Sequence, residues 1–121
     1  MSNKTPTPGK TYDDWLKDTL AIVVSSQDIL KDPLDPASMN HQATQAEEFQ
    51  VKLTEALSQA SAWLDFAKAR ELGNINADKT VLEKTILLDV AVMEERILRD
   101  KLEGLAMSMR SRMRRAAWGH T

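Results

Sequence analysis

The chain has 121 residues, with only 4 glycines, 4 prolines and 5% aromatic residues, so its composition favours a small helical domain. It has no cysteine, which excludes disulfides and thiolate chemistry and favours a reducing compartment. The net charge of −2 at pH 7 does not by itself predict a nucleic-acid partner. No apolar run approaches the roughly 18 residues of a membrane span, and the polar start lacks a signal-peptide pattern.

Residues 1–10 contain two prolines and a glycine, which predicts a flexible tail ahead of a single helical domain over 11–121. Thr11 and Asp14 stand three residues apart, as in a capping box. Apolar residues then recur at helical spacing and predict a short amphipathic helix over 12–31. They are Trp15, Leu16, Thr19, Leu20, Val23, Val24 and Leu30.

A second and longer helix is predicted over 36–72, with Asp35 as N-cap and Pro36 at its first position. Its apolar residues alternate steps of three and four, which indicates coiled-coil-like packing. They are Ala46, Phe49, Leu53, Ala56, Ala60, Trp63 and Ala67. Gly73 is the candidate for the position after this helix, and Asn76 for the next N-cap.

The third helix is predicted over 77–117, and its apolar residues form two stripes. Leu82, Ile86, Val90, Met93 and Ile97 mark the first half; Leu98, Leu102, Leu105, Met109, Met113 and Ala116 mark the second. A stripe that changes face predicts two partners, the second helix for the first half and another element for the rest. The distal end, near Met109 and Met113, then lacks a partner unless the first helix or another subunit supplies one.

The expected fold is therefore all-α, with a short N-terminal helix and a long antiparallel helical hairpin that self-associates into a homo-oligomer. The residues expected to pack the hairpin or the oligomer are Phe49, Leu53, Trp63, Leu102, Leu105, Met109 and Met113.

Catalytic and metal-binding patterns are not found in the sequence. His41 and His120 are the only histidines, and neither has a second ligand at helical spacing. Acidic pairs such as Glu47–Glu48 are adjacent, so on a helix they point about a hundred degrees apart. There is no glycine-rich phosphate loop. We therefore expect no enzyme activity, no cofactor and no metal site.

The basic C-terminus has two interpretations. Residues 110–121 hold four arginines and no acid, whereas the rest of the chain is acidic. On a helical wheel Arg110, Arg114 and Trp118 share one flank, and Arg112 and Arg115 lie on the far side. Guanidinium groups neutralise phosphates, and an aromatic ring stacks an unpaired base for about 1–3 kcal/mol. Alternatively, the cations complement the helix dipole and the tryptophan docks against a neighbouring subunit.

Two stretches, LSQASAWLDFAKARELG (57–73) and residues 81–118, resemble the UvsY-like recombination mediators, small helical accessory proteins of tailed phages. A middle motif and a terminal pattern with altered spacing carry the resemblance. They fall on Ala62, Trp63 and Leu64, and on Leu105, Met109, Ser111 and Arg112. The chain departs from the family in its middle segment, since Lys52 is the only lysine in 46–66.

The resemblance implies a homo-oligomeric, non-catalytic protein that binds single-stranded DNA and helps to load a recombinase onto DNA coated by single-strand-binding protein. The site residues would be Arg110, Arg112, Arg114 and Arg115 on phosphates and Trp118 on a base. The expected location is the cytoplasm, that of the host if a phage encodes the chain, without membrane contact. The alternative is a phage structural or assembly adaptor that packs through its hairpin without nucleic acid. An inhibitor of a host protein is a third possibility.

Overall fold

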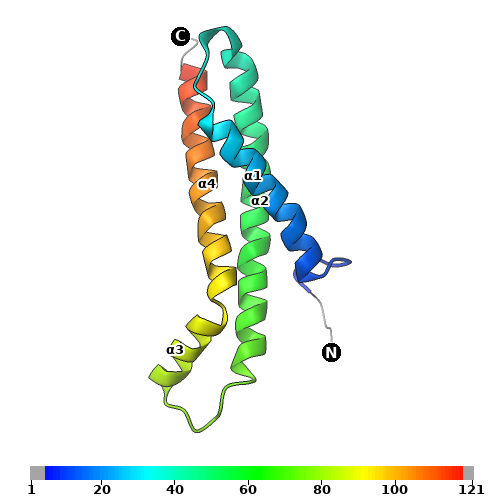
Figure 1. Cartoon of the computed structure of the whole chain (residues 1–121), viewed down its shortest axis with the longest axis vertical. Coiled ribbons are helices and arrows are strands. Elements are labelled where there is room, and N and C mark those ends of the chain that lie inside the picture. The colour runs from blue at the N-terminus through cyan, green and yellow to red at the C-terminus, as the bar shows by residue number, and fades with distance from the viewer. Residues whose placement is uncertain (1–4, 119–121) are drawn as a thin grey trace.

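The computed structural model describes residues 5–118, and of Trp118 only the backbone. Within them lie α1 (Tyr12–Lys31), a short 3₁₀ helix η1 (Pro36–Ser38), α2 (Met39–Leu72), α3 (Val81–Ala91) and α4 (Met93–Trp118) (Figure 1). These described residues include no strand, so the predicted all-α class is confirmed. None of the helices among them is long and apolar enough to cross a membrane.

The first predicted helix is confirmed with its N-cap, whereas the helix predicted over 36–72 is divided into η1 and α2, and Ser38, not Asp35, is the N-cap of α2. The Thr11 hydroxyl accepts a hydrogen bond from the Asp14 amide at 3.2 Å, which satisfies one of the free donors at the start of α1. The Asp35 carboxylate accepts from the Ala37 amide at 3.1 Å, at the start of η1. Gly73 directly follows α2, but its φ of −66° is right-handed, so this helix end does not require a glycine.

The core lies along the antiparallel pair of α2 and α4 (Figure 1). From α2 it takes Ala46, Leu53, Ala56, Ala60 and Trp63, and from α4 it takes Leu98, Leu102, Ala106 and Met109. The alanines of α2 let the two helices approach closely, and the larger side chains of Leu53, Trp63 and Leu102 fill the space between them. Each fully buried leucine contributes about 1.5–3 kcal/mol. The predicted hairpin therefore exists, with α4 as its second arm.

Helix α1 crosses this pair and is joined to it by aromatic side chains. The Trp15 indole N–H donates to the Gln59 Oε1 of α2 at 2.8 Å. The Tyr12 ring centroid lies 5.7 Å from that of Trp15 and 5.3 Å from that of Trp63. Because the Tyr12 and Trp15 rings of α1 cover α2 around Gln59 and Trp63, the N-terminal half of α1 closes one side of the core.

The connection between α1 and α2 is fixed by Gln42. Its side-chain oxygen accepts from the Asp35 amide at 2.9 Å, and its side-chain amide donates to the Pro33 carbonyl at 3.1 Å. Both backbone groups belong to a segment whose prolines prevent helical pairing. One buried glutamine of α2 thus supplies the hydrogen bonds that this turn lacks.

The third predicted helix starts later than expected. It begins at Val81, not Ala77, because Thr80 is the N-cap and its hydroxyl accepts from the Glu83 amide at 3.1 Å. The Glu83 carboxylate also accepts from the Thr80 hydroxyl. Asn76, the predicted N-cap, instead accepts from the Asp78 amide in the preceding turn.

The same predicted helix is also interrupted, because the chain leaves helical geometry at Val92 (φ −111°, ψ 21°). Val92 is fully buried with Leu64 and Ala67 of α2, while α3 turns away from α2 at an angle (Figure 1). An ion pair of 2.6 Å between Arg96 and Asp89 spans the break. The prediction of one continuous helix over 77–117 is therefore wrong.

The assignment of partners along this region is wrong as well. Met109 of the distal half is fully buried, and α1 and α2 cover that half. The first half is the exposed one, with Leu82, Ile86 and Val90 at 70%, 54% and 61% exposure. The antiparallel arm is therefore the C-terminal part, where Leu98, Leu102 and Met109 are buried against the core.

Candidate functional surfaces

The four arginines near the C-terminus do not form one surface. Arg110, Arg114 and Arg115 are exposed on α4. Arg112 has only 3% of its surface exposed, so its predicted role as a phosphate contact is wrong. The helical wheel predicts a solvent-exposed Arg112 because only apolar residues are assigned to the core on it.

Arg112 instead joins α4 to the end of α1. Its Nη1 donates to the backbone carbonyl of Asp32 at 2.7 Å, and Asp32 is the C-cap of α1. The negative end of a helix dipole stabilises a cation there. Its Nε and Nη2 are buried without a partner among the described residues, which is costly. Arg112 is therefore a structural tether whose charge is only partly compensated.

A signal for this burial is present in the sequence. The contact face of α4 continues in steps of four and three residues through the C-terminus. Its positions are Leu98, Leu102, Leu105, Met109, Arg112 and Ala116. The regular step after Met109 thus falls on Arg112, and Met113 lies beside it, partly buried. A charged residue at such a position predicts either a buried hydrogen bond or a break in packing.

The arginine surface, defined here as Arg110, Arg114 and Arg115, lies on the outer face of α4. No ion pair within the described part of the chain involves any of the three. Beside them, Met107 is 61% exposed. The side chain of Trp118 and the whole of His120 lie outside the described residues, so the predicted base-stacking contact is not placed.

A hollow of about 570 Å³ adjoins this surface, between the first turns of α2 and the end of α4. Its lining residues are Asn40, Ala43, Thr44, Glu47, Met113, Arg114 and Ala117. The hollow is wide and open, and Glu47 brings an acidic group into it. It is therefore poorly suited to an anion.

The residues predicted to pack the hairpin or the oligomer lie in the chain's own core. Leu53, Trp63, Leu102 and Met109 are buried there, and Phe49, Leu105 and Met113 pack partly buried against it. Leu53, Trp63, Leu102 and Met109 are therefore not accessible to a second subunit, and any oligomer interface would use exposed residues.

The second candidate surface is the α3 face, defined as Leu82, Ile86 and Val90. The three residues follow one another at four-residue spacing, so they lie on one side of the helix. No residue of α3 is buried, although the helix is apolar almost all round, a composition that belongs to buried helices.

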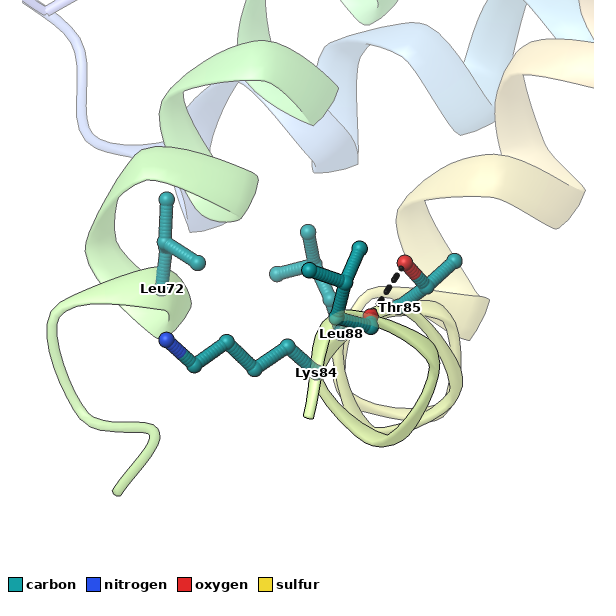
Figure 2. Close-up of a pocket in the computed structure, with 5 residues that line it drawn as sticks. Leu72, Lys84, Thr85 and Leu88 are labelled. Atoms are coloured by element: carbon teal, nitrogen blue, oxygen red, sulfur yellow. Dashed lines mark hydrogen bonds between the residues drawn. The ribbon is translucent and has the colours of Figure 1, made fainter. Parts of the chain in front are cut away.

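The opposite side of α3 only loosely covers α2. A hollow of about 220 Å³ separates them, lined by Leu72, Val81, Lys84, Thr85 and Leu88. Figure 2 shows Lys84 and Leu88 extending from α3 on the side of Leu72. The apolar surface also continues onto α4 through Met93 and Ile97, which are exposed.

Neither surface has the features of a catalytic or metal centre. No group of three histidine or acidic side chains within residues 5–118 is arranged to hold a metal ion, and His41 is exposed on α2. The two surfaces instead offer charge and apolar area for larger partners. No family model, curated protein or solved structure matches the chain.

Proposed function

We propose that the chain is a non-catalytic accessory protein that binds single-stranded DNA through the arginine surface and acts as a homo-oligomer. The observation that carries the proposal is the exposure of Arg110, Arg114 and Arg115 outside every ion pair among the described residues. Guanidinium groups outside ion pairs gain more from neutralising phosphates than those already paired with carboxylates.

The rest of the chain supports a local contact and not a wide binding channel. The net charge is −2, so strands would be repelled by the acidic body and held only at the end of α4. The sequence resemblance implies a biological role for this binding, in which the protein helps to load a recombinase onto DNA coated by single-strand-binding protein. We include that role in the proposal.

Binding of a fluorescein-labelled oligo-dT strand, followed by anisotropy over a salt series, tests this function. We expect binding at low salt that weakens steeply as salt rises. Replacing Arg110, Arg114 and Arg115 together by Gln should abolish binding, or make the log–log salt slope shallower by about 2, since each phosphate contact on a single strand contributes about 0.7.

A matched control removes the same charge elsewhere. Lys17, Lys52 and Lys101 are exposed on α1, α2 and α4, and their joint replacement by Gln should leave most of the affinity. Absence of binding by the unmodified chain at low salt, or equal losses in the two triple variants, would contradict the proposed function.

A second function is favoured by a different observation. The exposed α3 face suits a structural or assembly adaptor that binds another protein without nucleic acid. Two results together would favour this alternative. The unmodified chain would not bind oligo-dT, and the triple arginine variant would still bind its protein partner.

A further inference from the structure

The molecule exposes more surface than its mass requires. Its accessible area is 8126 Å², whereas a compact monomer of 13.6 kDa has about 6,600 Å². A standard protein interface takes about 800 Å² from each partner. The elongated hairpin, with α3 turned away from α2, leaves this additional surface uncovered (Figure 1), and an interface of standard size would fit on it.

Much of the exposed apolar surface is gathered around α3. Seven exposed large apolar residues lie within 81–97: Val81, Leu82, Ile86, Leu87, Val90, Met93 and Ile97. Beyond Ile97 the surface meets a groove of about 340 Å³ between α1 and α4, lined in part by Leu16, Leu20 and Leu98. An apolar surface of this extent marks an interaction site.

The charges beside the α3 face are already compensated within the chain. The Glu83 carboxylate lies 3.7 Å from the Lys79 ammonium group, and the Asp89 carboxylate lies 2.6 Å from the Arg96 guanidinium group. Neither acid of α3 is therefore left to select a basic partner. A neutral, apolar face is best complemented by another neutral, apolar face.

The spacing of the α3 face makes it complementary to itself. In an antiparallel pair centred on Ile86, Leu82 of one copy lies opposite Val90 of the other, and the two Ile86 residues meet on the twofold axis. The pair therefore has three apolar layers: Leu82 against Val90, Ile86 against Ile86, and Val90 against Leu82. This self-matching is what an isologous dimer interface requires.

We propose that a second copy of this chain covers the α3 face, through an antiparallel pairing of the two α3 helices about Ile86. The interface deepens the self-association included in the proposed function, but it does not require nucleic-acid binding. The arginine surface lies at the other end of α4, about 25 Å away along the helix, so the two sites are separable.

Sedimentation equilibrium of the full chain at tens of micromolar, without nucleic acid, tests the association. We expect a dimer for the unmodified chain and a monomer for Ile86→Glu, with a dissociation constant raised about 100-fold or more because an unpaired carboxylate would be buried at the axis. Val51→Glu is the matched control, since Val51 is 59% exposed on α2, and it should remain dimeric. A monomeric unmodified chain, or a dimeric Ile86→Glu variant, would overturn the proposal.

Disulfide formation tests the antiparallel arrangement, because the chain has no cysteine of its own. Two packed helices bring facing Cα atoms to about 5–6 Å, which is within the range for a disulfide. Under mild oxidation Ile86→Cys should therefore cross-link with itself. Leu82→Cys should not, because its two copies lie about 12 Å apart along the axis, but it should cross-link in a mixture with Val90→Cys. Efficient self-linking of Leu82→Cys would contradict the pairing, whereas oligo-dT binding would be unaffected by either result.

Discussion

At the scale of single residues, burial separates arginines that look equivalent in the sequence. Arg112 is held by the carbonyl of Asp32, while its neighbours at 110, 114 and 115 face solvent. The same side chain type thus joins two helices at one position and faces solvent at the others, where the proposed function assigns it to phosphate contacts.

We expect Arg112→Ala to lower the free energy of unfolding by about 2–4 kcal/mol, through the lost charge-assisted hydrogen bond and the cavity left behind. Arg112→Met keeps most of the volume and removes a charge whose Nε and Nη2 are unsatisfied, so it should change stability by less than about 1 kcal/mol or increase it. Urea denaturation measures both. A shift of under about 0.5 kcal/mol for Arg112→Ala, as expected for exposed Arg115→Ala, would contradict the tether.

Tyr12 gives a pH dependence. Burial, and then the nearby carboxylates of Glu95, Glu94 and Asp13, raise its pKa above the ordinary value of 10.0. The hydroxyl therefore stays protonated in the folded chain at a pH where the unfolded chain has ionised, and stability falls as pH rises above about 10. Tyr12→Phe should have a weaker loss of thermal stability between pH 9 and 11 than the unmodified chain. An identical pH profile would show that Tyr12 is not the group responsible.

At the scale of elements, α1 depends on few contacts. Trp15 is buried and donates to Gln59, and its ring packs near Tyr12 and Trp63. We expect Trp15→Ala to cost about 3–5 kcal/mol and to release α1, seen as faster amide hydrogen exchange over 12–31. Val24→Ala on the exposed side of α1 should cost less than about 0.5 kcal/mol. Equal effects of the two substitutions would contradict this role of Trp15.

The helices α1 and α2 were predictable because apolar residues recur at helical spacing in both, and because the Thr11 cap marks the start of α1. The interruption at Val92 was not, since neither glycine nor proline marks it. Carried back from Leu98 in steps of three and four, the contact face of α4 falls on Glu95, Ala91, Leu88 and Lys84, whereas the residue buried against α2 at the break is Val92. The contact face is therefore out of register by one position at the break, and no single residue type in the sequence marks that shift.

The start of α3 has a signal in the sequence that the prediction of Asn76 as N-cap misses. Thr80 and Glu83 stand at the same spacing as Thr11 and Asp14, and the Thr80 hydroxyl caps α3 by accepting from the Glu83 amide. Of the candidate site, the exposure of Arg110 and Arg114 follows from the wheel. The burial of Arg112 depended on which helix lies opposite, and apolar residues alone did not determine that.

At the scale of the whole molecule, the two surfaces lie at opposite ends of α4. The α3 face gathers apolar area near the start of that helix, and the arginine surface gathers positive charge near its end (Figure 1). In an antiparallel α3 dimer the two arginine surfaces lie at the outer ends. Strands would therefore bind one per chain, at the two outer ends of the dimer.

Native mass spectrometry of the full chain, with and without a short oligo-dT strand at low ionic strength, tests this arrangement most directly. We expect a dimer without DNA and the same dimer carrying up to two strands when DNA is added. A dimer that binds no strand would contradict the nucleic-acid role. A monomer with or without DNA would contradict the α3 interface.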